Sequence, residues 1–173
     1  MSVARKRIIP HQKVNTIYEL DLDGLYESGI RYLMIDVDNT LVPTGASDIP
    51  DVLYRWMEDA KKRFSVCLLS NSKRKRILML ARLFGVEGVY YSMKPTGLGY
   101  RRAARKLGVI DPSQVCVIGD QLYTDIWMGR RMGCHTVLVT PCSDVDHFWT
   151  RALRRIEGKK LLRHGPQHHG EGT

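Results

Sequence analysis

Short apolar runs alternate with amphipathic segments along the chain, and this alternation restricts the possible folds more than any other feature of the sequence. The apolar runs have the length of strands; they cover 32–36, 65–70, 88–92, 114–118 and 135–140. The segments between them carry apolar residues at helical spacing; they cover 50–63, 73–84, 97–107 and 122–132. Gly85, Gly108 and Gly133 follow three of these segments, where glycine commonly ends a helix. The pattern predicts an α/β fold: a three-layer, Rossmann-like parallel sheet with helices on both faces.

Length and composition are those of a single soluble domain. A chain of 173 residues can bury one core but is too short for two ordinary domains. No apolar run approaches the roughly 20 residues that a membrane-spanning helix needs. The N-terminal stretch MSVARKRIIPHQKV is basic, but it lacks the apolar core and cleavage site of a secretory signal. We therefore expect a cytoplasmic protein.

Basic residues outnumber acidic ones and give the chain a formal net charge of +9. Such a surplus favours anionic partners, which include nucleic acid, phosphorylated small molecules and acidic lipid. Part of the surplus can serve solubility alone. The distribution of the charge therefore matters more than its sum.

Two groups of residues are interpreted as structural. The four cysteines are scattered, form no CxxC pair and lie mostly in or beside apolar runs, so they predict neither a disulfide framework nor a zinc site. They are Cys67, Cys116, Cys134 and Cys142. The tyrosines and the methionine of VYYSM, at 89–93, are interpreted as core and edge residues of the third strand.

Polar side chains follow four successive predicted strands, at the point where each strand ends. Parallel strands present their carboxyl ends at one edge of the sheet, where α/β proteins form their sites. We therefore expect these side chains to converge. They are, in chain order, Asp36, Asp38, Thr40, Ser70, Asn71, Lys94, Asp120 and Asp125.

The acidic residues of this set predict a magnesium site. Mg²⁺ prefers oxygen ligands and is usually held by a pair of carboxylates together with substrate phosphate oxygens. Asp36 and Asp120 are the natural carboxylate pair, and the backbone carbonyl of Asp38 is a candidate for a further ligand. Asp125 is expected to orient Lys94 or a metal-bound water.

The same residues predict phosphate chemistry through a covalent intermediate. With a metal ion and Lys94 screening negative charge, Asp36 can attack an anionic phosphorus and form an aspartyl phosphate. Asp38, two residues later, would protonate the leaving oxygen and then deprotonate the attacking water. Lys94 would stabilise the charge of the transferring oxygens.

The remaining members of the set have structural alternatives. Ser70 and the backbone around Asn71 can donate hydrogen bonds to phosphate oxygens, but they can also cap the helix predicted at 73–84. Thr40 is expected to fix the loop after the first strand. Asp125 can instead be the N-terminal cap of the following helix. The carboxylates as a group can also be ordinary turn residues, although the agreement of four strand ends argues against this.

The set resembles the four motifs of the haloacid dehalogenase (HAD) superfamily of phosphatases. DVDNT at 36–40 resembles the nucleophile motif DxDxT, and Ser70 and Lys94 resemble the second and third motifs. GDQLYTD at 119–125 resembles the fourth motif, GDxxxxD. The resemblance covers residues 32–140 in the correct order and implies phosphate transfer to water. A binding module that has kept the fold and lost catalysis is an alternative.

The spacing of these motifs leaves no room for a cap domain. Each gap between the first three motifs holds about one helix and one strand. An uncapped site cannot enclose a small metabolite alone, so it suits a phosphate carried by a lipid surface, a protein or a nucleic acid. We expect an N-terminal basic segment with a short helix at 1–30, a phosphatase core at 31–145, a basic amphipathic helix at 146–163 and a disordered tail at 164–173.

The whole-chain pattern further resembles an uncapped subfamily, IIIA, that includes the phosphatidylglycerophosphate phosphatases. The resemblance rests on RKRIIPHQKV, TIYELDLDGL and DVDNTLVP. It implies an anionic phospholipid monoester as substrate. The basic amphipathic helix predicted at 146–163 can bring the protein into peripheral contact with the inner face of an anionic membrane, or its apolar stripe can pack on the sheet. A protein or nucleic-acid phosphate is the alternative substrate, the latter weakened by the few aromatics among the basic runs. The sequence predicts no oligomeric state.

Overall fold

The computed structural model describes residues 8–46 and 48–142. The predicted helix at 146–163 and tail at 164–173 lie outside these described residues, as do residues 1–7. The predicted boundaries between the segments of the chain therefore stay predictions.

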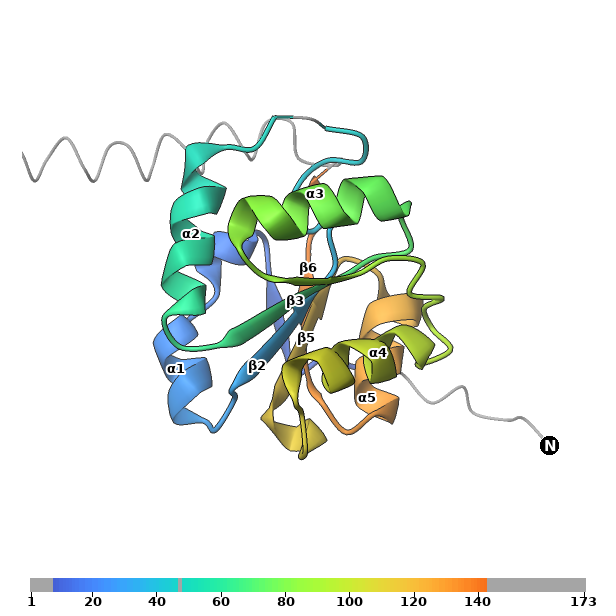
Figure 1. The fold of residues 1–173 in the computed structure, drawn as a ribbon. Coiled ribbons are helices and arrows are strands. Elements are labelled where there is room, and N and C mark those ends of the chain that lie inside the picture. The colour runs from blue at the N-terminus through green and yellow to red at the C-terminus, as the bar shows by residue number, and fades with distance from the viewer. Residues whose placement is uncertain (1–7, 47, 143–173) are drawn as a thin grey trace, which may run out of the picture. The chain divides into compact units, whose positions relative to one another are not determined.

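One parallel sheet forms the centre of the described chain (Figure 1). Its strands are β1 (Gln12–Val14), β2 (Tyr32–Ile35), β3 (Ser65–Leu69), β4 (Glu87–Val89), β5 (Val115–Gly119) and β6 (His135–Val139). Their order across the sheet is β1-β6-β5-β2-β3-β4, and every pairing is parallel. The five predicted strands are confirmed. The sequence pattern did not predict β1, which pairs with β6 at the edge of the sheet.

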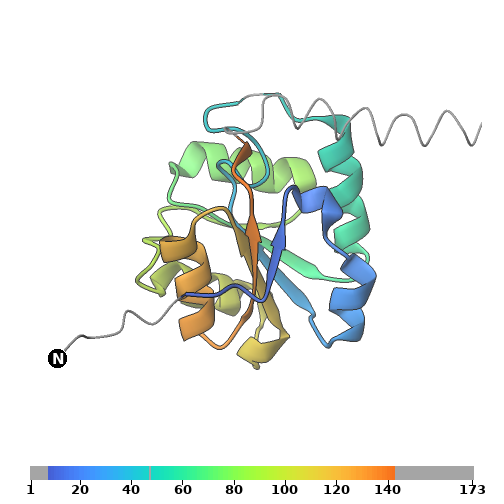
Figure 2. The same cartoon turned by 180° about the vertical axis from the view of Figure 1, so that it is seen from behind.

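Helices cover both faces of the sheet, as predicted (Figures 1 and 2). The α-helices are α1 (Leu22–Glu27), α2 (Asp51–Lys61), α3 (Arg74–Phe84), α4 (Leu98–Leu107) and α5 (Trp127–Arg131). Short helical turns at Ile17–Glu19 and Pro112–Gln114 and a π-helical turn, η3 (Leu122–Ile126), complete the described elements. The predicted α/β class with a parallel sheet is therefore confirmed. Within the described ranges no cap domain is inserted between these elements.

Alternate side chains of the strands feed two separate cores. Leu33 and Ile35 of β2 pack in one cluster with Leu53 of α2 and Ile77 of α3. Met34, between them, packs in the other cluster, which includes residues of α4 and α5. A strand buried on both faces needs apolar residues at every position, which explains the continuous apolar runs. Three helices therefore cover one face, and two cover the other.

Glycine ends two of the helices where the sequence predicts it. Gly85 follows α3 and Gly108 follows α4, both with the left-handed backbone that favours glycine. These stops fix the length of each helix. They return the chain to the amino end of the next strand, so that every strand delivers its carboxyl end to the same edge.

The segment after β4 differs from its predicted form. The strand ends at Val89 and not at residue 92. Tyr91 and Met93 both adopt positive φ, and both side chains are exposed, so their interpretation as core and edge residues is wrong. Ser92, between them, is fully buried.

Two further expectations concern cysteines and membrane spans. All four cysteines lie within the described residues and are buried, as expected for small apolar side chains. Among the helices that the structure describes, none combines the length and the apolar character that crossing a bilayer requires.

Candidate active site

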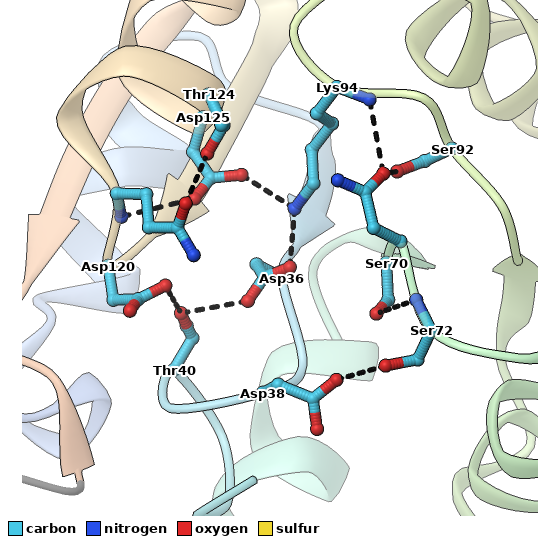
Figure 3. A network of polar contacts seen from close by, with 12 residues as sticks. Asp36, Asp38, Thr40, Ser70, Ser72, Ser92, Lys94, Asp120, Thr124 and Asp125 are labelled. Carbon is cyan, nitrogen blue, oxygen red and sulfur yellow. Dashed lines mark hydrogen bonds and ion pairs between the residues drawn. The ribbon is translucent and has the colours of Figure 1, made fainter.

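The predicted site residues gather at the carboxyl edge of the sheet, on loops that leave β2, β3, β4 and β5 (Figure 3). The backbone N–H of Asp36 donates to the carbonyl of Ile118 at 2.9 Å, which continues the pairing of β2 with β5. This bond holds Asp36 at the end of a rigid strand. The central position of β2 places its neighbours from β3 and β5 on either side.

Three of the predicted carboxylates form one cluster. Asp36, Asp120 and Asp125 each offer an oxygen atom, and these atoms lie within 4.8 Å of one another. Thr40 Oγ1 lies 3.4 Å from an oxygen of Asp36 and 3.4 Å from an oxygen of Asp120. The Thr40 hydroxyl therefore links the loop after β2 to the loop after β5. Such a cluster of hard oxygen donors suits a divalent cation.

Lys94 supplies the positive charge at this cluster. Its ammonium donates to Asp36 and, at 2.6 Å, to Asp125. The Lys94 side chain is only 4% exposed, so water screens these ion pairs weakly. Burial lowers the pKa of Lys94, but the carboxylates of Asp36 and Asp125 outweigh burial and raise it overall. The lysine therefore remains charged.

Burial raises the pKa of two carboxylates of the cluster, Asp36 and Asp120. Burial raises the pKa of Asp36 to about 7, although the nearby Lys94 opposes the shift. Burial, followed by the negative charge of Asp125, also raises the pKa of Asp120. Gathering negative groups in a partly dry site is unfavourable without a cation. The arrangement thus favours the binding of positive charge.

Asp38 stands apart from the carboxylate cluster and has its own partners (Figure 3). Ser72 Oγ donates to one of its oxygens, and the guanidinium of Arg76 lies 3.1 Å from the other. Asn39, the next residue, has a φ of 63°, a left-handed conformation that asparagine tolerates well. This tight turn separates the side chain of Asp38 from that of Asp36.

Ser70 and Asn71 do not cap the helix that follows them. The N-terminal cap of α3 is Lys73, without a side-chain hydrogen bond. Ser70 Oγ instead accepts a hydrogen bond from the backbone N–H of Ser72. The side-chain oxygen of Asn71 accepts from Ser92 Oγ at 2.8 Å and from the backbone N–H of Lys94 at 3.1 Å. Asn71 therefore ties the loop after β3 to the segment that carries Lys94.

Asp125 is not an N-terminal cap either. It lies inside η3 and is buried, and its carboxylate accepts a hydrogen bond from the backbone N–H of Gln121 at 3.2 Å. The second oxygen receives the Lys94 ammonium. The structural alternative considered for Asp125 is therefore wrong, and its contact with Lys94 agrees with the predicted orienting role.

Two residues outside the predicted set, Ser72 and Arg76, contact Asp38. Ser72 lies two positions after Ser70, and Arg76 lies in the first turn of α3. Arg76 directly precedes Ile77, which is buried. Arg76 therefore lies at the border of the buried face of α3. This helical phase was the available signal within the run KRKR at 73–76.

Comparisons with known proteins identify the family. The HAD-hydrolase-like family model matches residues 92–141, and the mitochondrial PGP phosphatase model matches residues 1–82. Probable phosphatase YqeG of Bacillus subtilis is 32% identical over 158 residues, which cover 91% of this chain and 91% of that protein. Phosphatidylglycerophosphate phosphatase 1, chloroplastic/mitochondrial, of Arabidopsis thaliana is 27% identical, over 92% of this chain and 49% of that protein.

A solved structure agrees with the fold. The putative HAD-hydrolase YfnB of Bacillus subtilis, bound to magnesium, has a TM-score of 0.52 at 12% identity, over 68% of this chain and 97% of that one. At this identity the likeness shows the fold alone. The extent of the match to YqeG shows the relationship directly: the chain is a HAD-type phosphatase and belongs to the PGP phosphatase family.

Proposed function

We propose that the chain is a Mg²⁺-dependent phosphomonoesterase that uses Asp36 as its nucleophile and acts on phosphatidylglycerophosphate. The observation that carries the proposal is the buried contact of Asp36 with Lys94, beside the carboxylates of Asp120 and Asp125. This arrangement pairs a nucleophilic oxygen with fixed positive charge and with a cluster that suits a cation.

The donor set fits magnesium. Carboxylate oxygens are its preferred protein ligands, and oxygens of Asp36, Asp120 and Asp125 lie within 4.8 Å of one another. Asp36, Asp120 and Asp125 would hold the ion, with the backbone carbonyl of Asp38 as a further candidate. When bound, the ion would lower the repulsion between Asp36 and an anionic phosphate.

Asp36 and Asp38 divide the reaction between them. An oxygen of Asp36 forms a bond to phosphorus while the bond from phosphorus to the ester oxygen breaks, and Asp38 gives its proton to the leaving oxygen. Asp38 then takes a proton from a water molecule, whose oxygen attacks the aspartyl phosphate. Inorganic phosphate leaves, and the carboxylate of Asp36 is regenerated. Lys94 balances negative charge throughout.

The proposed substrate is supported by the relatives of this chain and by the lack of a cap domain over the described core. The family implies a phosphomonoester, and the Arabidopsis relative is named for phosphatidylglycerophosphate. The described core has no cap domain, so the phosphate must be reached at an open edge. A substrate anchored in a lipid surface suits such an edge, and the net charge of +9 favours an anionic surface.

The test is phosphate release from phosphatidylglycerophosphate, with and without magnesium, by the wild type and by Asp36→Asn. We expect the substitution to lower turnover by roughly three orders of magnitude or more, because it removes the nucleophile. Asp59→Asn is the matched control, since Asp59 forms an exposed ion pair on α2 and should not affect the rate. Turnover that survives in Asp36→Asn would reject the nucleophile. Faster release from an oligonucleotide or phosphopeptide would reject the lipid substrate.

A further inference from the structure

The segment after β4 exposes two apolar side chains beside the candidate active site. Tyr91 is 53% exposed and Met93 is 57% exposed. Both residues adopt left-handed backbone conformations, with φ of 44° and 52°. Such conformations are uncommon for residues with a bulky side chain. The chain therefore accepts two unfavourable backbone conformations and, in addition, places two apolar side chains in water.

Buried contacts of Ser92 impose this conformation. The Ser92 N–H donates to the carbonyl of Ser70 at 3.0 Å, and its hydroxyl donates to Asn71 at 2.8 Å. Its carbonyl accepts from the N–H of Gly99 at 2.9 Å, and a side chain at position 99 would overlap Ser92. With Ser92 held inward, its two neighbours are turned outward. The exposure of Tyr91 and Met93 is thus built into the structure.

Two arginines lie beside Tyr90, the residue that directly precedes the exposed segment. The guanidinium of Arg102 lies 5.4 Å from the centre of the Tyr90 ring, and that of Arg74 lies 5.7 Å from it. Arg102 also donates to the carbonyl of Tyr90 at 3.1 Å. Neither arginine forms an ion pair with a carboxylate in the part of the chain that the structure describes. Their charge is therefore available to an external anion.

We infer that the segment 91–93 is a membrane-docking element that enters the surface of an anionic lipid bilayer. Aromatic and apolar side chains flanked by arginine suit the boundary between headgroups and acyl chains. Arginines near that surface gain from its negative potential. The inference rests on the proposed function, because a docked phosphatase needs a substrate that the bilayer presents.

The position of the segment agrees with this role. Met93 directly precedes Lys94, whose ammonium contacts Asp36. In Figure 1 the chain between β4 and α4 runs along the rim between the beginnings of α3 and α4. A bilayer that received Tyr91 and Met93 would therefore lie against the edge of the sheet that carries the candidate active site.

The first test is cosedimentation of the full chain with vesicles of phosphatidylcholine and phosphatidylglycerol, without any hydrolysable substrate. We expect Tyr91→Asn/Met93→Asn to bind these vesicles about ten-fold more weakly than the wild type. Asparagine is chosen because it tolerates left-handed φ. Ile110→Asn is the matched control. Ile110 is 94% exposed and precedes β5, so it lies at the amino ends of the strands, away from the candidate active site. Its substitution should leave vesicle binding unchanged.

The second test reports insertion directly and does not depend on the stability of the double variant. Because all four native cysteines are buried, Met93→Cys offers a single exposed thiol for an environment-sensitive fluorophore. We expect its emission to shift to the blue with the anionic vesicles, and less with phosphatidylcholine alone or in high salt. The same label on Ile110→Cys should not shift.

Unchanged vesicle binding by the double variant, together with an unshifted label at position 93, would overturn the inference. Self-association that requires Tyr91 and Met93, without vesicle binding, would assign the surface to a second copy of the chain and overturn it as well. Failure of the proposed function would give a different result from failure of the inference. In that case the label at position 93 would still report insertion, while no phosphate would be released from phosphatidylglycerophosphate.

Discussion

Asp38 owes its position to two side chains that come from the loop and helix after β3. Ser72 donates to one oxygen, and Arg76 pairs with the other at 3.1 Å. Arg76 also donates to the carbonyl of Ala46 at 3.1 Å, so the same guanidinium holds the loop that follows β2. An acid that must reach a leaving oxygen needs a fixed position. We therefore interpret Arg76 as a positioning residue for Asp38.

Arg76→Gln should slow the hydrolysis of esters with poor leaving groups far more than that of activated aryl esters. In the proposed mechanism an alkyl ester needs the proton from Asp38, whereas a nitrophenolate leaves without one. We expect the rate constant kcat to fall about ten- to hundred-fold for an alkyl phosphate and only slightly for nitrophenyl phosphate. A series of aryl phosphates whose leaving groups differ in pKa measures this effect. The value of kcat should fall more steeply with leaving-group pKa for Arg76→Gln than for the wild type.

Two controls separate positioning from general damage. Arg82→Gln removes an exposed arginine from the same helix and should leave the leaving-group dependence unchanged. In an Asp38→Asn background, Arg76→Gln should cause little further loss, because the acid that it positions is already absent. Equal losses for all leaving groups would contradict the positioning role.

At this scale, the sequence identified side chains by type and order but not their local partners. Asp36, Lys94 and Asp125 follow strand ends, where a parallel sheet must gather them. Ser72 and Arg76 lie among similar residues in the stretch SNSKRKR at 70–76, which offers two serines and four basic side chains. Only the helical phase of α3 and the course of the loop decide which of them reaches Asp38.

At the scale of elements, the junction of β5 and η3 determines the shape of the site. Gly119 ends β5, and Asp125 returns over it from the π-helical turn. A methyl group at position 119 would overlap the Asp125 carboxylate, the group that receives Lys94. The strand and the turn can approach this closely only because position 119 carries no side chain.

Gly119→Ala should therefore reduce both stability and activity. Overpacking at this position should cost about 1–3 kcal/mol of the free energy of unfolding and displace Asp125 from Lys94. Gly108→Ala is the comparison: Gly108 has left-handed φ but open space around it, so it should lose stability and keep its activity. Denaturant unfolding and phosphate release measure the two quantities. Full activity in Gly119→Ala would contradict the close packing.

The elements themselves were predictable where the apolar pattern is continuous. β2, β3 and β5 are buried on both faces, and their boundaries differ from the prediction by about one residue. β1 was missed because it has only three residues, and its side chains are exposed or half-buried at the edge of the sheet. The early end of β4 was missed because contacts of Ser92 with distant segments, and not local propensity, turn the backbone at Tyr91 and Met93.

At the scale of the whole molecule, the charge is divided between a basic chain and an acidic site. The chain carries a formal net charge of +9, yet Asp36, Asp120 and Asp125 gather within a few ångströms. Lys94 offsets only part of this local negative charge. A cation bound by the folded state, but not by the unfolded chain, would stabilise the protein by mass action.

The pH dependence of this stabilisation follows from Asp36. In the metal-free protein, burial raises the pKa of Asp36 from 3.8 to about 7. The pKa of Asp36 is therefore higher in the folded state than in the unfolded state. Proton binding by Asp36 stabilises the metal-free fold fully below about pH 4, and this stabilisation is lost as the pH rises through about 7. Magnesium requires the ionised carboxylate, so protons compete with it below about pH 7.

Magnesium should therefore raise the melting temperature Tm, and the increase should be larger at about pH 8 than at about pH 5.5. At a concentration about 100-fold above its dissociation constant, the ion would contribute about 2.7 kcal/mol. For a chain of this length, that corresponds to an increase in Tm of about 5–10 °C. Asp120→Asn should remove most of the increase, whereas the exposed Asp59→Asn should keep it. Thermal unfolding with sodium at matched ionic strength excludes screening. An equal increase at both pH values would show that the ion binds elsewhere on the protein.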